Sequence, residues 1–276
     1  ETWLHPHLPS LARSMGQAGY HSVYHYPCAM TNMGKRDYLT NIGFQELMDN
    51  MVYSAEEINS TWGANDSTSA MKTFHRIEQK DSAEHLFMVY QTVSSHEPWV
   101  VPYNRLQDEK LNAFAYTDYS VGLLIDSLKT LPQWDSLLVI MIPDHGYLYK
   151  QSYEDPEFFH SPMLWLGGAI RQPRRMQVLM NQSDLAATLL SQLGISHRDY
   201  PWSRNVLSRN YTYPFAYCCF PAGIMWKDHT GETLFDITAN SLVTDHHAGG
   251  EERLRKAQSV LQTGYDWYSE QMHTFR

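Results

Sequence analysis

The sequence predicts an α/β fold with a mostly parallel sheet and helices on both of its faces. Along most of the 276 residues, short apolar runs that end in turn residues alternate with longer segments of helical spacing. Such alternation is typical of βαβ units, in which helices connect parallel strands. After Tyr213 the pattern changes to short strands separated by turns. We therefore expect an α/β domain over residues 1–208 and a β-hairpin and helix portion over residues 209–276 packed on it.

Turn and capping residues place the elements of the first half. Ser10 begins a helix over residues 11–18 that Gly19 ends, and a strand over residues 20–26 follows. The further elements are a short helix over 36–41, a turn over 62–66, a helix from a Ser67 or Thr68 cap to about residue 80, a strand over 85–92 and a long helix over 107–128.

The second half contains the remaining strands of the predicted sheet and then the antiparallel portion. The Asp228–Gly231 segment predicts a hairpin turn, because Asp and Gly are typical turn residues. The elements are strands over 137–142 and 163–166, a helix over 185–193 capped by Ser183 and Asp184, strands over 214–220, 223–227 and 233–237, and a helix over 251–275.

Composition excludes some classes of function. The formal net charge is -9 and the sequence has no basic stripe, so we expect no nucleic-acid partner. Its three cysteines form no recognisable disulfide or zinc pattern, and they leave the cellular compartment open. No apolar run is as long as a membrane span. The sequence begins without Met and leads directly into a helix, from which we expect an upstream part of the protein.

The run from Leu137 to Ile142 is followed by Asp144, His145 and Gly146. In open α/β sheets, ligands bind beyond the carboxyl ends of the strands. An oxygen donor next to a nitrogen donor suits a divalent metal such as zinc or manganese. In the alternative interpretation, Asp144 caps a turn and His145 is an ordinary hydrogen-bonded side chain.

A second strand, over residues 85–92, leads to His96. If both strands are parallel in one sheet, His96 emerges at the same edge as Asp144 and His145. His160 lies 16 residues after Asp144, and the loop between them is long enough to fold back over that edge. Three imidazoles and a carboxylate would then share one cleft.

These residues resemble motifs of the alkaline phosphatase superfamily, in particular its sulfatase-like branch with lipoteichoic acid synthases and phosphoethanolamine transferases. The resemblance covers about residues 8–240 in the order of the family. It rests on Ser95-His96-Glu97-Pro98, Tyr116-Thr117-Asp118, Ile142-Pro143-Asp144-His145-Gly146, Trp62-Gly63 with Asp66, His160-Ser161-Pro162, and the Ser183–Ile195 segment.

The resemblance implies a role for each matched residue. Asp144 and His145 match the pair that binds a catalytic divalent metal. His96 and Arg36 match residues that contact the anionic substrate, and His160 matches a histidine that binds a second metal or the substrate in some members. Members with two zinc ions carry Asp where this sequence has Thr92, so we expect one ion, with Mn, Zn, Mg and Ca all open.

The resemblance also implies a phospho-group transferase or hydrolase that works through a covalent intermediate. The family nucleophile precedes the matched segments, so we expect it before residue 1 and expect these 276 residues alone to be inactive. Synthases and transferases of this branch act on anionic phospholipid- or glycan-linked substrates. We therefore expect membrane helices before residue 1 and a location at the outer face of the bacterial cytoplasmic membrane.

Two other functions are open. A sulfatase would hydrolyse sulfate esters, but Cys219-Phe220-Pro221-Ala222-Gly223 only imitates the sulfatase Cys-x-Pro-x-Arg pattern and ends in Gly. We expect Cys218 and Cys219 to be core residues of a strand. A non-catalytic binding domain with the same fold is compatible with the Met33-Gly34 pair in the substrate loop. Trp62 and Trp99 line the cleft or pack in the core.

Overall fold

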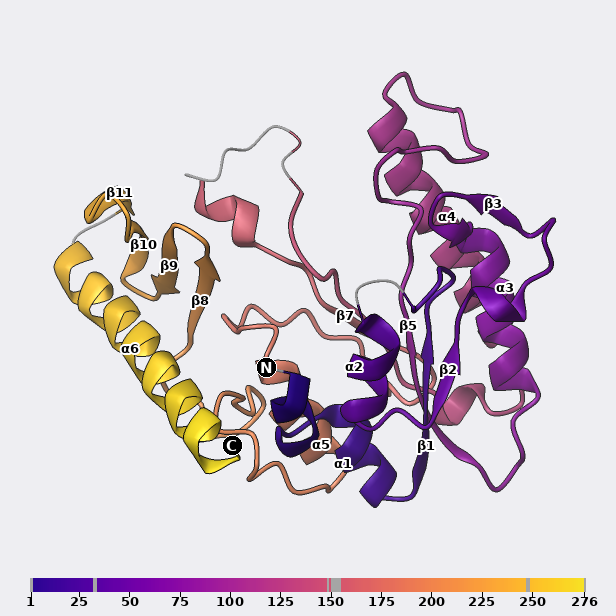
Figure 1. The fold of residues 1–276 in the computed structure, drawn as a ribbon, viewed down its shortest axis with the longest axis horizontal. Coiled ribbons are helices and arrows are strands. Elements are labelled where there is room, and N and C mark those ends of the chain that lie inside the picture. The colour runs from indigo at the N-terminus through magenta and orange to yellow at the C-terminus, as the bar shows by residue number, and fades with distance from the viewer. Residues whose placement is uncertain (1, 32–33, 148, 150–154, 247–248, 276) are drawn as a thin grey trace. The chain divides into compact units, whose positions relative to one another are not determined.

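The computed structural model describes the chain except for residues 1, 32–33, 148, 150–154, 247–248 and 276 (Figure 1). The chain forms two compact units. One comprises Glu1–Leu137 with Gly167–Ala169, and the other comprises Leu138–Leu166 with Ile170–Arg276. The domain boundary predicted at residue 208 lies within the second unit, and the division at that position stays a prediction.

A three-stranded parallel sheet lies at the centre of the first unit. Its order is β2-β1-β5, with β1 (Tyr20–His25) between β2 (Glu46–Met48) and β5 (His85–Tyr90). Val23 in the middle strand is fully buried, as expected for a sheet that is covered on both faces. Because the strands are parallel, the segments that follow all three begin at one edge.

Helices cover both faces of this sheet (Figure 1). The described helices of the unit are α1 (Leu11–Gln17), α2 (Lys35–Asn41), α3 (Asp66–Glu78) and α4 (Glu109–Leu128), with the 3-10 segments η1 (Thr2–His7), η3 (Asn50–Val52) and η4 (Trp134–Ser136). α3 packs on one face, where Thr73 bonds to His25 of β1. α4 packs on α3, and α2 packs on the other face through Leu39.

A short hairpin occupies the segment that the sequence predicted to be a turn. β3 (Ile58–Ser60) and β4 (Gly63–Ala64) pair antiparallel just before α3. The predicted cap of α3 at Ser67 or Thr68 is wrong. Asn65 caps the helix, because its backbone is extended and its side chain accepts the Thr68 N–H at 3.3 Å.

The second unit begins with β6 (Val139–Met141), which pairs antiparallel with β7 (Leu164–Leu166). The expectation that this strand shares one parallel sheet with β5 is not met among the described strands. A run of apolar residues identifies a buried strand but does not determine its partner. The 3-10 segment η5 (Pro156–Phe159) lies between the two strands in the sequence.

A four-stranded antiparallel sheet and a long helix form the C-terminal portion, where the sequence predicted three of the strands and the helix. The elements are β8 (Phe215–Phe220), β9 (Gly223–Asp228), β10 (Gly231–Asp236), β11 (Ser241–His246) and α6 (Gly250–Thr274). α6 packs on this sheet through a cluster of Ile224, Trp226, Phe235 and Ala257. The hairpin turn at Asp228–Gly231 is confirmed, whereas β11 was not predicted. Together with the parallel sheet and its helices, this confirms the predicted fold class.

Ser183 is the N-cap residue of the helix α5 (Asp184–Gln192), as predicted, but its side chain makes no cap bond. The Asp184 carboxylate is fully buried and accepts hydrogen bonds from the Arg204 side chain, so it joins the helix to a later segment.

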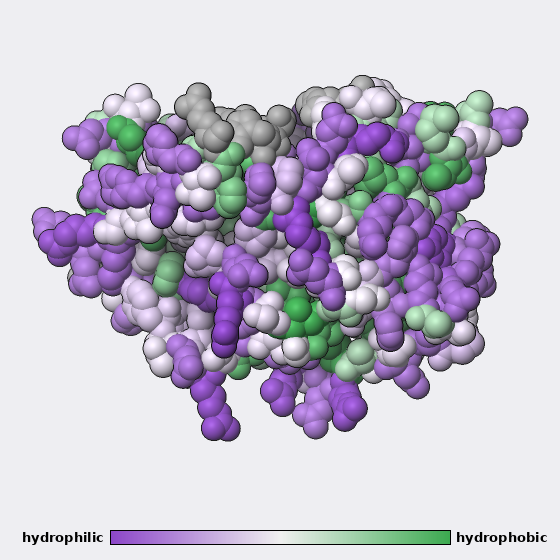
Figure 2. Space-filling model, turned by 60° about the horizontal axis from the view of Figure 1, so that its bottom comes forward, coloured by the Kyte–Doolittle hydropathy of each residue, from purple (hydrophilic) through white to green (hydrophobic). Residues whose placement is uncertain are grey.

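Polar side chains cover most of the face drawn in Figure 2. Within the described residues, no helix combines the length and hydropathy needed to cross a bilayer.

Candidate functional site

A pocket of about 470 Å³ lies where the chain continues beyond β5. One part of its wall comes from the β3–β4 hairpin and the other from the segment after β5. The lining residues are Ile58, Asn59, Ser60, Thr61, Trp62, Val93, Ser94, His96, Pro98 and Val100. His96 is exposed and Trp62 is partly buried, while Trp99 is buried beside Phe114. Of the two tryptophans, Trp62 therefore lines the pocket and Trp99 packs in the core.

The carboxylate of Asp66 holds the segment that leads from β5 to His96. Asp66 is fully buried, and its Oδ1 accepts the N–H groups of Val93 at 2.8 Å and Ser94 at 3.2 Å. Its Oδ2 accepts the Thr117 hydroxyl at 2.7 Å, and its own N–H donates to Ser94 Oγ at 2.9 Å. As the first residue of α3, it also lies where the helix dipole favours a negative charge. The backbone just before His96 is thus fixed by a fully hydrogen-bonded carboxylate.

Gly63 allows the hairpin wall of the pocket to press against the segment after β1. Its φ is +91°, and a Cβ at this position would lie 2.0 Å from the carbonyl oxygen of Pro27. Both the backbone conformation and the close approach exclude a side chain. The adjacent Trp62 is therefore held at a fixed place beside the sheet.

Arg36, the predicted substrate ligand of α2, forms an ion pair with a buried carboxylate. Its Nη2 contacts Oδ2 of Asp49, which directly follows β2. The Asp49 side chain is 4% exposed and that of Arg36 is 42% exposed. Asp49 also accepts the Met51 N–H at 3.1 Å. The guanidinium is therefore oriented by the protein and still accessible from solvent.

Lys35 is a second cation at this edge of the sheet, and the sequence prediction did not assign it a role. Its ammonium donates to Gln91 Oε1 at 2.6 Å and lies 3.5 Å from the centre of the Tyr26 ring. The only sequence signal was its position directly before Arg36. Met33, of the Met33-Gly34 pair in the proposed substrate loop, lies outside the described residues.

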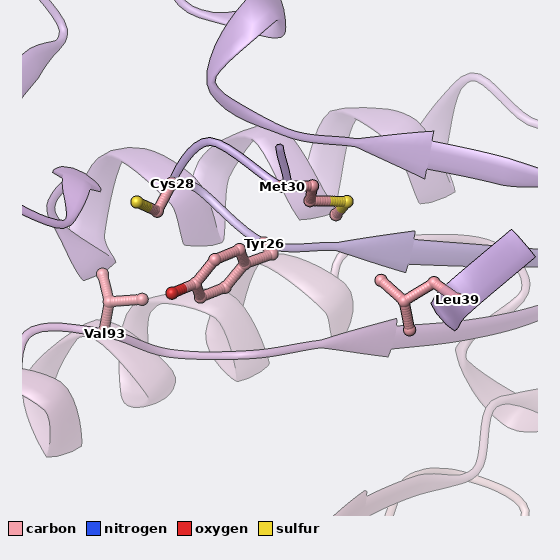
Figure 3. Packing of buried hydrophobic residues seen from close by; sticks show 5 residues of the cluster. All are labelled: Tyr26, Cys28, Met30, Leu39 and Val93. Atoms are coloured by element: carbon pink, nitrogen blue, oxygen red, sulfur yellow. The ribbon is translucent and has the colours of Figure 1, made fainter. Parts of the chain in front are cut away.

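A buried cluster fixes the segments that carry these groups. It consists of Tyr26, Cys28, Met30, Leu39 and Val93 (Figure 3). The members come from the segment after β1, from α2 and from the segment after β5, and the hydroxyl end of the Tyr26 ring points toward Val93. Burial raises the pKa of Tyr26 to about 12. The cluster places the elements that carry Arg36 and His96 at the carboxyl edge of one sheet.

His25, at the end of β1, is a buried histidine that the sequence prediction missed. Its exposure is 0%. Its ring nitrogens lie 2.7 Å from Thr73 Oγ1 and 2.6 Å from the Tyr53 hydroxyl, and its ring stacks with those of Tyr53 and Tyr90. Burial, reinforced by the charge of Lys72, lowers the pKa of His25 to about 4. The imidazole is therefore neutral and structural near pH 7.

Asp144 and His145 follow β6 in the second unit and are exposed. Their side chains are 76% and 72% exposed, and His145 Nε2 lies 3.8 Å from Asp144 Oδ2. His145 Nδ1 lies 2.7 Å from the Gly146 carbonyl oxygen, which favours a proton on Nδ1 and leaves Nε2 as a donor for a metal. The pair thus presents one oxygen and one nitrogen to solvent.

His160 belongs to the same unit, and the segment directly before it lies against Gly146. A Cβ at Gly146 would lie 2.3 Å from the carbonyl oxygen of Phe158, so η5 lies directly against the residue after His145. His160 Nδ1 is 3.3 Å from Glu157 Oε2. The structure therefore brings the segments of Asp144, His145 and His160 together within this unit.

The donor chemistry of Asp144 and His145 fits a divalent metal in part. A carboxylate oxygen and a neutral imidazole nitrogen suit zinc or manganese. Catalytic zinc sites use three protein ligands, and no group of three His, Cys, Asp or Glu side chains suited to a metal occurs among the described residues. The two residues fit as part of a site that needs at least one further ligand.

The cysteines of β8 do not have the properties of a nucleophile. Cys218 and Cys219 lie in the strand, as predicted, but Cys219 is exposed, so its expected place in the core is wrong. Successive strand residues point to opposite faces, which explains why only one of the two is shielded. Desolvation still raises the pKa of the Cys219 thiol, which disfavours the reactive thiolate.

Comparisons with known proteins identify a family and similar folds for this chain. A family model described as Sulfatase matches residues 3–195. A protein in the alkaline phosphatase superfamily from Vibrio parahaemolyticus is 20% identical with a TM-score of 0.78, over 94% of this chain and 68% of that one. The lipoteichoic acid synthase LtaP from Listeria monocytogenes is 16% identical with a TM-score of 0.76, over 96% and 74%.

A more distant likeness is to the C-terminal periplasmic domain of EcEptC from Escherichia coli, also solved in complex with Zn. It is 17% identical with a TM-score of 0.52, over 83% of this chain and 71% of that one. At such identities the solved structures establish the fold. The predicted resemblance to the alkaline phosphatase superfamily is confirmed.

Proposed function

Because the chain belongs to the sulfatase family, we propose that it is part of an enzyme that transfers or hydrolyses a phospho group. Phosphoglycerol and phosphoethanolamine are the groups that we propose, on an anionic phospholipid- or glycan-linked substrate. The observation that carries this proposal is the place of His96, in the wall of a pocket at the carboxyl edge of the parallel sheet. Ligands of open α/β sheets bind at that edge.

His96 and Arg36 have the chemistry to bind a phospho group. A His96 imidazolium, which donates from Nε2, and a half-exposed guanidinium can both hydrogen-bond to non-bridging oxygens, where negative charge develops in the transition state. Asp49 fixes the guanidinium, and Asp66 fixes the backbone before His96. Such groups act without having to reorganise during the reaction. His96 is also placed to protonate a leaving oxygen.

Asp144 and His145 are the ligands that we propose for one divalent ion, and His160 is a further ligand of the ion or of the substrate. When bound, a divalent ion lowers the pKa of a hydroxyl and stabilises oxygens that gain charge. The hydroxyl nucleophile of the covalent step is expected before residue 1 and is part of this proposal. The identity of the ion among Mn, Zn, Mg and Ca stays open.

We propose that the enzyme works at the outer face of the bacterial cytoplasmic membrane. The supporting observation is the likeness to the periplasmic domain of EcEptC. An anchor of membrane helices before residue 1 belongs to the same proposal. Protease treatment of intact spheroplasts tests the location, and protection of the chain until lysis would contradict it.

The test of the proposed reaction uses the full-length protein and fluorescent phosphatidylglycerol with each of the four ions. We expect release of diacylglycerol, with a loss of about 100-fold in His96→Ala, as for the removal of one oxyanion donor. Asp126→Ala, which removes an exposed carboxylate paired with Lys129, is the matched control and should keep full activity.

Other outcomes of this test would support the two alternatives. Hydrolysis of an aryl sulfate without any turnover of the phospholipid would support a sulfatase. The family model favours that alternative, although the Cys219 segment lacks the sulfatase arginine. Absence of both turnover and ion binding would support a non-catalytic binding domain.

A further inference from the structure

Two N–H groups converge on the main-chain carbonyl oxygen of Glu97. His96 Nδ1 lies 3.0 Å from this oxygen, and the indole Nε1 of Trp62 donates to it as well. The rings of Trp62 and His96 are also in contact, with centroids 4.4 Å apart and planes inclined at 55°. A carbonyl oxygen has two lone pairs and can accept both bonds. Indole, imidazole and carbonyl therefore form a closed group of three contacts.

We propose that Trp62 is a positioning residue, which acts through the Glu97 carbonyl to fix the tautomer and the orientation of His96. Only an imidazole that carries its proton on Nδ1 can donate to this carbonyl. Its Nε2 is then an acceptor in the neutral ring and a donor in the protonated ring, so it is the nitrogen kept for the substrate. This inference rests on the proposed function, in which His96 binds the phospho group.

Trp62 is suited to this role because it is anchored in the interior. Its ring packs against the buried cluster of Figure 3, and its main-chain N–H donates to Ser60 Oγ at 3.2 Å. Its neighbour Gly63 is pressed against the Pro27 carbonyl. The hairpin that carries Trp62 therefore cannot shift freely, and neither can the indole N–H.

His96 needs such an anchor because it lies on an exposed segment. Asp66 fixes the backbone at Val93 and Ser94, two residues before His96. Beyond that point, the Trp62 bond to Glu97 connects the segment to the hairpin. Without the indole N–H, the carbonyl is free to turn away, and the His96 proton is no longer held on Nδ1.

The first test measures the tautomer of His96 by ¹⁵N NMR of the full chain with labelled histidine, at alkaline pH. The His96→Asn variant identifies the signals. We expect wild-type His96 to carry its proton on Nδ1, and Trp62→Phe to shift both nitrogen signals toward the average of the two tautomers. A wild-type proton on Nε2, or an unchanged spectrum in Trp62→Phe, would overturn the proposal.

Trp202→Phe is the matched control. The Trp202 ring packs against Trp267 with centroids 6.0 Å apart, and its buried Nε1 has no hydrogen-bond partner within the described residues. This variant removes an indole N–H that bonds to nothing there, so the His96 signals should not move.

The second test is a double-mutant cycle on the phospho-transfer reaction of the full-length protein. Trp62→Phe should lower kcat/KM about tenfold, a typical effect for a residue that orients a ligand side chain. In the His96→Asn background the same change should have no further effect. An equal loss in both backgrounds would overturn the positioning role. The tautomer measurement needs no activity, so it separates a failure of this inference from a failure of the proposed function.

Discussion

His96 and His145 make the same local contact in different surroundings. In each, Nδ1 lies close to the carbonyl oxygen of the following residue, at 3.0 Å from Glu97 and 2.7 Å from Gly146. The segment of His96 is held by Trp62 and by the buried Asp66, whereas the contacts described for His145 are with its sequence neighbours.

This difference distinguishes the region that we propose for substrate binding from the pair that we propose for ion binding. The edge of the parallel sheet that we propose for substrate binding is organised by the protein interior. The Asp144–His145 pair is exposed, and the contacts described for it are with residues next to it in the sequence. Changes in the first region should therefore reduce stability, and changes in the second should reduce ion binding while leaving stability intact.

The largest effect should come from Gly63→Ala. The new Cβ would meet the Pro27 carbonyl and would also impose a positive φ on alanine. Overpacking and backbone strain together should lower the free energy of unfolding by roughly 3 kcal/mol or more, measured by urea unfolding. Gly19→Ala is the control, because its φ is +89° but nothing lies within 4 Å. It should cost only about 1 kcal/mol. An equal loss in both variants would show that the close approach is unimportant.

The next effect is the dependence of stability on pH through His25. Its pKa is lowered to about 4 in the folded chain, against 6.5 when unfolded. Between these values the unfolded chain binds a proton that the folded chain does not, so stability falls as the pH drops through this window. The loss should approach roughly 3 kcal/mol near pH 4.

Urea unfolding between pH 7 and pH 4 measures this dependence. The His25→Gln variant serves as the reference, because it keeps the other titrating groups and should show a shallower decline. Parallel curves for the two proteins would mean that His25 does not contribute.

The smallest effect on stability should come from Asp144→Ala. The carboxylate is 76% exposed, and its described contacts are with His145, so the free energy of unfolding should change by less than about 0.5 kcal/mol. Affinity of the full-length protein for Mn²⁺, measured by calorimetry, should be lost. A large loss of stability with unchanged ion affinity would reverse the comparison between the two regions.

Much of the fold was predictable because its main elements have strong local signals. An apolar run predicted β5, and a segment of mixed apolar and polar residues after Gly19 predicted β1. Gly19 predicted the end of α1, and in the structure it has the positive φ that glycine tolerates. β2 was missed because a pattern of three residues is too short to identify a strand. β11 has six residues, but its sequence neither alternates nor forms a longer apolar run. The pairing of β6 with β7 depends on tertiary contacts that periodicity does not contain.

The sequence predicted single residues of the candidate site, but not the hydrogen bonds and ion pairs that connect them. Asp66 and Thr117 belonged to the motifs that carried the family resemblance, but their hydrogen bond joins two helices and becomes visible only in the folded chain. The same applies to the pairing of Arg36 with Asp49 and to the burial of His25. The roles of His96, Arg36, His160, Asp144 and His145 stay predictions.

The antiparallel sheet of the second unit supports the segment before His160. The Phe159 ring stacks on Phe220 of β8 with centroids 5.8 Å apart, and Lys227 of β9 lies 3.6 Å from Glu157. Removal of the residues after 208 would therefore strip one side of the η5 segment. Sequence changes in these hairpins, far from any motif, can therefore change how firmly His160 is held.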